Sequence, residues 1–137
     1  MGLQGVRNME IAEMLDRIRL LAKEYPGLDR RGVVKICLMD VGIRSSLDGY
    51  WYLFYVLGNW ECTSRGVVCK ELYPMIASHF GVDCEQASVG IRRAIQSAWK
   101  EQSAPSWKIY FPERRKPNNA EFILRMLQVL EFWDAFR

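Results

Sequence analysis

The stretch LYPMIASHFGVDCEQASVGIRRAIQSAW, from Leu72 to Trp99, decides the fold of this 137-residue chain. It reads as a short helix, a tight turn and a second helix. Gly81 suits the turn because glycine readily adopts the positive φ at which many helices end. Asp83 suits the N-cap of the second helix, since its carboxylate can accept bonds from first-turn amides that have no helical partner. The stretch therefore predicts a helix-turn-helix.

Both helices of this motif have an apolar stripe at helical spacing. We expect the first stripe at Ile76, Ala77 and Phe80, and the second, within Cys84 to Lys100, at Ala87, Ile91, Ala94, Ile95 and Ala98. The second helix then turns outward Glu85, Gln86, Ser88, Val89, Arg92, Arg93 and Gln96. Gln, Ser and Arg side chains hydrogen-bond base edges, and arginine also contacts phosphate. This outward face is typical of a DNA-recognition helix, and the alternative is a helical hairpin with a solvated polar face.

Basic residues are concentrated in one part of the chain. Residues 92–116 hold seven lysines and arginines against two glutamates, a local charge of +5 in a chain whose net charge is +3. Arg114, Arg115 and Lys116 form a basic run directly before the last predicted helix. Such polarity favours a polyanionic partner, although a solvated loop with clustered charges is the alternative.

Four collinear segments carry a family resemblance: DVGIRSSLDGYWYL (40–53), LYPMIASHFGVD (72–83), IRRAIQSAW (91–99) and KPNNAEFI (116–123). Together they resemble the C-terminal DNA-binding effector domain of the stage-zero sporulation master response regulator, over roughly Val33 to the C-terminus. The resemblance implies an all-α domain of about six helices that binds double-stranded DNA at a short promoter box, often as tandem molecules on adjacent boxes, with a homodimer as the alternative. It also implies a transcription regulator located in the cytoplasm, at the nucleoid.

The recognition helix departs from the family at several positions. Where the family carries charged base-reading residues, this chain has Gln86, Ser88 and Val89, whereas Arg92 keeps a family arginine and Arg93 replaces a common histidine. Because one good bidentate base contact is worth about 1–3 kcal/mol of discrimination, the preferred DNA sequence should differ from that of the family. The residues before the shared region are too few for a receiver domain, so we expect no phosphorelay input.

The first 30 residues form a predicted N-terminal unit, and residues 31–137 form the predicted helix-turn-helix domain. A helix is expected from Asn8 to Glu24, with an apolar face made of Ile11, Met14, Leu15, Ile18 and Leu21. That face either covers the domain core or binds a second copy or another protein.

Further helices are expected at Arg31 to Val41, Leu47 to Asn59 and Asn118 onward, the last with a capping box completed by Glu121. Pro74 should lie in the first turn of its helix, which would then start near Tyr73, with Val67 to Leu72 as a preceding turn or a kinked extension. The helix at 47–59 is apolar on all sides, so Phe54 and Tyr55 are either buried or part of an added contact surface. We expect residues 102–113, which are rich in helix breakers, to run over the surface.

Catalysis, cofactors and a resident metal are not indicated. The chain has one histidine, no phosphate-binding glycine loop and no nucleophile motif, so we expect no enzyme. Its four cysteines show no CxxC pair and should be reduced thiols, and a zinc site made of Cys62, Cys69, His79 and Cys84 is disfavoured by their spacing. No apolar run is long enough to cross a membrane.

The sequence therefore predicts a DNA-binding transcriptional regulator. Its predicted contacts are Arg92 and Arg93 to phosphate and guanine; Gln86, Ser88, Val89 and Gln96 at or near base edges; and Arg114, Arg115 and Lys116 to the DNA backbone. The alternative is a protein–protein interaction module that modulates another regulator through a domain whose DNA-binding face has decayed.

Overall fold

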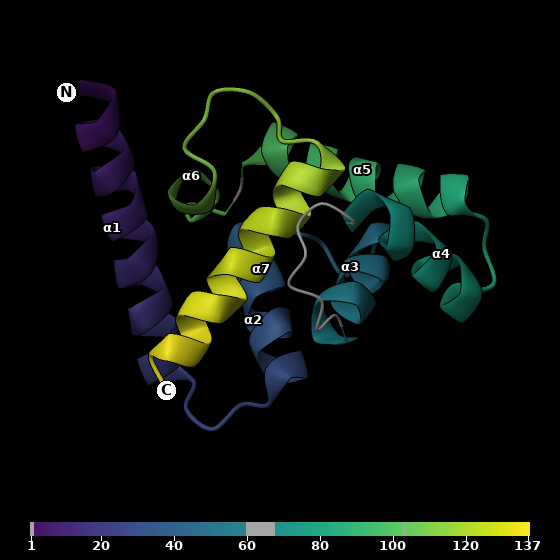
Figure 1. The fold of residues 1–137 in the computed structure, drawn as a ribbon, viewed down its shortest axis with the longest axis horizontal. Helices are drawn as coiled ribbons and strands as arrows, with labels where there is room; N and C mark the ends of the chain where they lie inside the picture. Colours follow the sequence, from purple (N-terminus) through teal and green to yellow (C-terminus); the bar gives the residue numbers. More distant parts are fainter. Residues whose placement is uncertain (1, 60–67, 103) are drawn as a thin grey trace.

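The structure is a computed structural model that describes residues 2–59, 68–102 and 104–137, with side chains from residue 11 onward except at 68–70. Within these ranges it is all-helical, as predicted, and contains seven helices (Figure 1). They are α1 (Gly2–Glu24), α2 (Arg30–Val41), α3 (Asp48–Asn59), α4 (Val68–Phe80), α5 (Cys84–Glu101), α6 (Trp107–Tyr110) and α7 (Asn119–Ala135). One core joins them, and its largest fully buried side chains include Trp107, Tyr110, Phe122 and Trp133.

Helices α3 and α5 cross at a point where two glycines meet. A Cβ atom added at Gly49 would lie 2.2 Å from the carbonyl oxygen of Gly90, and one added at Gly90 would lie 2.7 Å from the ring of Tyr52. No side chain fits in that space, so glycine at both positions lets the two backbones touch. Leu53 of α3 and Ala94 of α5 are fully buried. The crossing therefore fixes where α5 lies on the core.

Helix α1 packs on the core through one face. Met14, Ile18 and Leu21 are buried, while Ile11 is 43% exposed and Leu15 is half-buried. Figure 1 shows α1 beside α6 and the C-terminal part of α7. Of the two uses expected for this apolar face, covering the core is therefore confirmed.

A polar network also attaches α1 to the core. Asp40 of α2 accepts hydrogen bonds from Arg17 Nε at 3.0 Å, from Tyr110 Oη at 2.7 Å and from Ser106 Oγ at 3.3 Å. Arg17 also forms an ion pair with Asp40, whose side chain is only 9% exposed. Burial and the neighbouring Asp40 carboxylate raise the pKa of Tyr110 above the usual range. One carboxylate thus joins α1, α2 and α6.

Three local expectations are wrong. Helix α4 begins at Val68, so Pro74 lies inside it rather than in its first turn. Phe80, expected in the buried stripe, is 36% exposed and contacts the rings of Tyr52 and Tyr55 edge-on. Residues 102–113 do not simply run over the surface, because Trp107, Tyr110 and Phe111 insert into the core and form α6. The free energy gained by burying these aromatic side chains outweighs the low helix propensity of the breaker residues around them.

The glycine crossing yields a stability prediction. We expect Gly49→Ala to lower the free energy of unfolding by about 1–3 kcal/mol or more, because its methyl group would overlap the α5 backbone. Gly58→Ala, in the same helix, would meet its nearest atom at 3.5 Å and should be neutral or stabilising by up to about 1 kcal/mol, since alanine favours helix over glycine. Urea unfolding of both variants measures the difference, and equal stabilities would contradict the crossing.

The Asp40 network yields a second prediction. Asp40→Asn should cost about 1–3 kcal/mol, because the amide cannot accept all the hydrogen bonds that converge on the carboxylate. The matched control is Asp16→Asn, whose exposed ion pair with Arg19 spans 3.4 Å and should contribute about 0.5 kcal/mol or less. Thermal unfolding followed by circular dichroism tests this, and a loss no larger than that of the control would show that the network does not hold α1.

Candidate nucleic-acid interface

The turn between α4 and α5 has the geometry that its sequence predicts. Gly81 has a φ of 69°, and its N–H donates to the carbonyl of Ala77 at 2.9 Å. The Asp83 carboxylate accepts the N–H of Gln86 at 2.7 Å, while Gln86 Oε1 accepts the N–H of Asp83 at 2.9 Å. This reciprocal capping box stabilises the start of α5. The helix-turn-helix boundaries expected from Gly81 and Asp83 are confirmed.

The buried face of α5 is as predicted, whereas its outer face is exposed at five of the seven expected positions. Ala87, Ile91, Ala94, Ile95 and Ala98 are all buried. On the outer face Arg92, Arg93 and Gln96 are exposed, whereas Ser88 and Val89 are half-buried. The side chains of Arg92, Arg93 and Gln96 form no hydrogen bond or ion pair with any other residue in the described ranges. Two of the cations on the face of α5 are therefore free to bind an anion.

Gln86 has a structural task that the sequence analysis did not assign. Its position on the outer face predicts a base contact, whereas the DxxQ pattern of residues 83–86 is a sequence signal for the capping box that the structure contains. Its Oε1 already accepts one hydrogen bond in the cap, whereas its Nε2 has no hydrogen-bond partner among the described residues. A contact from Gln86 to a base stays a prediction.

Asn119, which the sequence analysis missed, joins the start of α7 to the helix-turn-helix. Its Nδ2 donates to Tyr73 Oη at 3.0 Å and to the carbonyl of Ser88 at 2.9 Å. One side chain thus connects α7 with α4 and α5. Sequence gives little sign of this role, since Asn119 follows directly on the N-cap Asn118 and looks like part of the same cap.

Asn119 lines a groove beside α5. The groove has a volume of about 400 Å³ and is lined by Tyr73, Arg92, Arg115, Lys116 and residues 117–121. It brings the free guanidinium of Arg92 next to Lys116 and the N-terminus of α7. Cationic side chains and a helix N-terminus are the groups that proteins use against phosphate.

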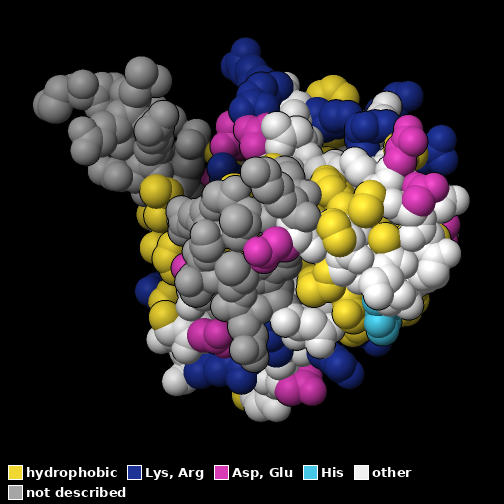
Figure 2. Space-filling model, turned by 45° about the vertical axis from the view of Figure 1, so that its right-hand side comes forward, with side chains coloured by type: hydrophobic (Ala, Val, Ile, Leu, Met, Phe, Trp, Pro, Cys, Tyr) yellow, Lys and Arg dark blue, Asp and Glu magenta, His cyan; other side chains and the backbone are white. Residues whose placement is uncertain are grey.

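The basic run 114–116 is divided by the structure. Arg115 donates from both terminal nitrogens to the carboxylate of Glu121, while Arg114 lies by a different hollow, beside Trp99 and Lys108. Only Arg115 and Lys116 adjoin Arg92. Figure 2 shows lysines and arginines gathered along the top of the molecule, where Figure 1 places α5 and the segment before α7.

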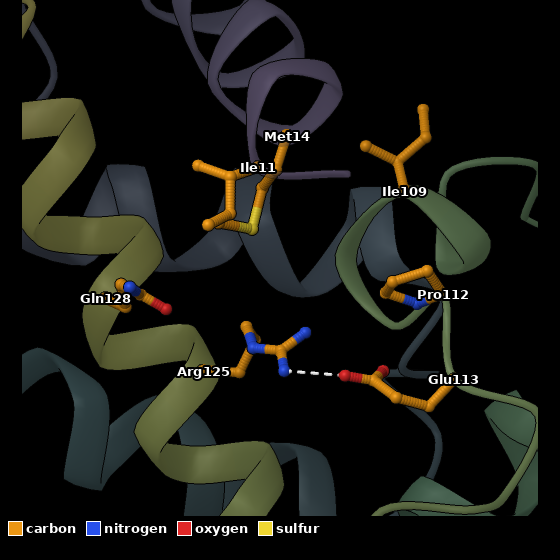
Figure 3. A pocket seen from close by; sticks show the side chains of 7 residues that line it. All are labelled: Ile11, Met14, Ile109, Pro112, Glu113, Arg125 and Gln128. Atoms are coloured by element: carbon orange, nitrogen blue, oxygen red, sulfur yellow. Dashed lines mark hydrogen bonds and ion pairs between the residues drawn. The ribbon is translucent and has the colours of Figure 1, made fainter. Parts of the chain in front are cut away.

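A second hollow, between α1, α6 and α7, has a different character. It measures about 360 Å³, and Figure 3 shows Arg125 within it, bonded to Glu113 at 2.8 Å. Arg125 also donates to the carbonyl of Tyr110 and lies over the ring of Phe111. Its positive charge is therefore compensated inside the protein and adds little to an anion-binding surface.

The described side chains include no cluster of His, Cys, Asp and Glu that could hold a metal ion. Burial raises the pKa of the Cys37 thiol to about 12, and His79 stacks on Tyr55 with ring centroids 3.9 Å apart. The side chains of Cys62 and Cys69 lie outside the described part. Tyr55 and Phe54 are half-buried and pack against the core. No helix in the described ranges is long and apolar enough to cross a membrane.

A comparison with protein-family models identifies the family of the chain. The model of the family described as "Sporulation initiation factor Spo0A C terminal" matches residues 34–130. The chain belongs to this family. The Spo0A C-terminal domain is a DNA-binding effector domain of the sporulation regulator, and its family is not an enzymatic one. The match begins within α2, so α1 lies outside it, whereas the helix-turn-helix and the groove beside α5 lie inside it.

Removing the side chain of Asn119 tests whether its hydrogen bonds to Tyr73 and Ser88 stabilise the fold. Asn119→Ala should lower the free energy of unfolding by about 1–2 kcal/mol, because two partly buried hydrogen bonds are lost. The control, Asn59→Ala, loses an exposed bond of 2.8 Å to the carbonyl of Tyr55 in its own helix and should change stability less. Urea unfolding compares the two, and a larger loss in the control would show that Asn119 does not anchor α7.

Proposed function

We propose that the protein is a sequence-specific DNA-binding regulator of transcription, and that α5 is its recognition helix. The observation that carries the proposal is the outer face of α5, where Arg92, Arg93 and Gln96 are exposed and have no partner among the described residues. A cationic face on the second helix of a helix-turn-helix fits the major groove of DNA. Membership of a DNA-binding family supports the same conclusion.

The charges along α5 suggest how the helix meets the duplex. Its first turn carries Asp83 and Glu85, which would repel phosphates, whereas Arg92, Arg93 and Lys100 lie in the middle and at the end. We therefore place the middle of α5, rather than its tip, against the DNA.

The proposed contacts differ between the two arginines. Arg92 lines the groove beside Lys116, so both are assigned to backbone phosphate. Arg93 and Gln96 lie on the open part of the face and are assigned to base edges, with Val89 as an apolar neighbour. Gln86 and Ser88 are secondary, because the cap holds Gln86 and Ser88 is half-buried.

A titration of duplex DNA tests the assignment of Arg92. Arg92→Ala should weaken binding and lower the slope of log K against log salt concentration by about one, because one fewer counterion is released. The control is Arg31→Ala, which removes the same charge from the exposed first turn of α2. Fluorescence anisotropy over a range of salt concentrations provides both values.

A second experiment tests whether the protein recognises a particular DNA sequence. Genomic fragments that the protein retains should yield a shared motif, and a duplex with that motif should bind about a thousandfold or more tighter than random DNA. The stoichiometry on this duplex distinguishes one copy from the tandem copies or homodimer that the resemblance implies. If no fragment is enriched and Arg92→Ala behaves as Arg31→Ala, the protein is instead an interaction module with a decayed DNA face.

A further inference from the structure

We propose that Glu121 is an intramolecular competitor of DNA: it holds Arg115 away from phosphate and thereby limits the affinity of the protein for any duplex. This inference rests on the proposed function. It concerns one ion pair at the mouth of the groove beside α5, where a carboxylate lies among the cations assigned to DNA.

In the ion pair, the Glu121 carboxylate occupies the position at which a phosphate would bind the Arg115 guanidinium. Arg115 Nη1 donates to Glu121 Oε1 at 2.9 Å, and Nη2 forms an ion pair with Glu121 Oε2. The guanidinium thus presents its two parallel N–H groups to a carboxylate, in the arrangement that also binds a phosphate bidentately. A phosphate and Glu121 therefore compete for the same donors.

The carboxylate cannot move away from the groove without a loss to the fold. Glu121 Oε1 also accepts the N–H of Asn118 at 3.0 Å, while the Asn118 side chain accepts the N–H of Glu121 at 2.8 Å. This capping box fixes Glu121 at the start of α7. The bond from Arg115, followed by that from Asn118, lowers the pKa of Glu121 to about 2, so its negative charge persists at neutral pH.

Arg115, in contrast, is easily released. Its side chain is 68% exposed, and exposed ion pairs contribute little to stability because water and salt screen them. Arg92 and Lys116 line the same groove and form no ion pair with the described residues. Of the three cations at the groove, Arg115 is therefore neutralised by a residue of the capping box, whereas Arg92 and Lys116 are not.

The chain itself supplies the conservative substitution that tests the proposal. Its other capping box, at the start of α5, has glutamine rather than glutamate at the same third position, where Gln86 accepts the N–H of Asp83. Glu121→Gln should therefore keep the cap and remove the charge. The matched control is Glu131→Gln on the exposed surface near the other end of α7, which changes the net charge equally.

The experiment is an anisotropy titration of random duplex DNA with the full chain. We expect Glu121→Gln to bind about three- to tenfold tighter than the unchanged chain and to steepen the salt slope by about 0.9, since Arg115 then releases a counterion. Glu131→Gln should change both quantities much less. Adding Arg115→Ala to Glu121→Gln should abolish the gain, whereas Arg115→Ala alone should change affinity less than about twofold.

Several results would overturn the inference. Weaker binding by Glu121→Gln would mean that Glu121 positions Arg115 for DNA, and binding equal to that of Glu131→Gln would mean that Arg115 meets no phosphate. If Arg92→Ala weakens binding in the same assay, only the inference about Glu121 has failed. If no variant binds DNA better than Arg92→Ala, the proposed function has failed together with it. Circular dichroism melting curves of Glu121→Gln confirm that the cap is intact.

Discussion

The contact of α3 and α5 at Gly49 and Gly90 is the constraint on which the rest of the structure depends. The two helix backbones approach so closely there that a single methyl group would meet the carbonyl oxygen of Gly90 at 2.2 Å. The buried stripe of α5 packs toward the core, with Gly90 and Ala94 against Gly49 of α3, and the exposed Arg92 and Arg93 lie outside this stripe. The exposure of Arg92 and Arg93 is thus a consequence of packing on the other side of the same helix. A recognition helix needs this rigid support, since base contacts require side chains held in a fixed place.

Among the described residues, two kinds of cation can be contrasted. Arg17 and Arg125 are compensated inside the fold by Asp40 and Glu113, and they join α1 and α7 to the rest. Arg92 and Arg93 have no such partner among the described residues and are available to a polyanion. Net charge alone therefore says little about binding. What matters is which positive charges the fold leaves uncompensated. At the groove beside α5, Glu121 of the α7 capping box compensates Arg115, whereas Arg92 and Lys116 form no ion pair with the described residues.

Local signals of the sequence predicted the helix-turn-helix well. Gly81, Asp83 and the alanine and isoleucine stripe of α5 act within one or two turns, so their effect can be read from neighbours in the chain. Features that depend on distant partners could not be predicted in this way. The need for glycine at positions 49 and 90 is evident only from the crossing of α3 and α5. Asn119 bonds to Tyr73 and Ser88, which are 46 and 31 positions away. The local signal around Trp107 and Tyr110 was misleading. The breaker residues near them favour a surface loop, whereas burial of the two side chains in the core determines the structure of this segment. The base-reading roles of Gln86, Ser88, Val89 and Gln96 remain predictions.

The central claim is that α5 and the start of α7 together form the surface that meets DNA. Backbone amide chemical shifts of the full chain, recorded with and without a selected duplex, test it most directly. We expect the shifts to change mainly in residues 89–100 and 115–120, with little change in the exposed parts of α1 and in the first turn of α2. Changes centred on α1 or α3, with α5 unaffected by saturating DNA, would contradict it.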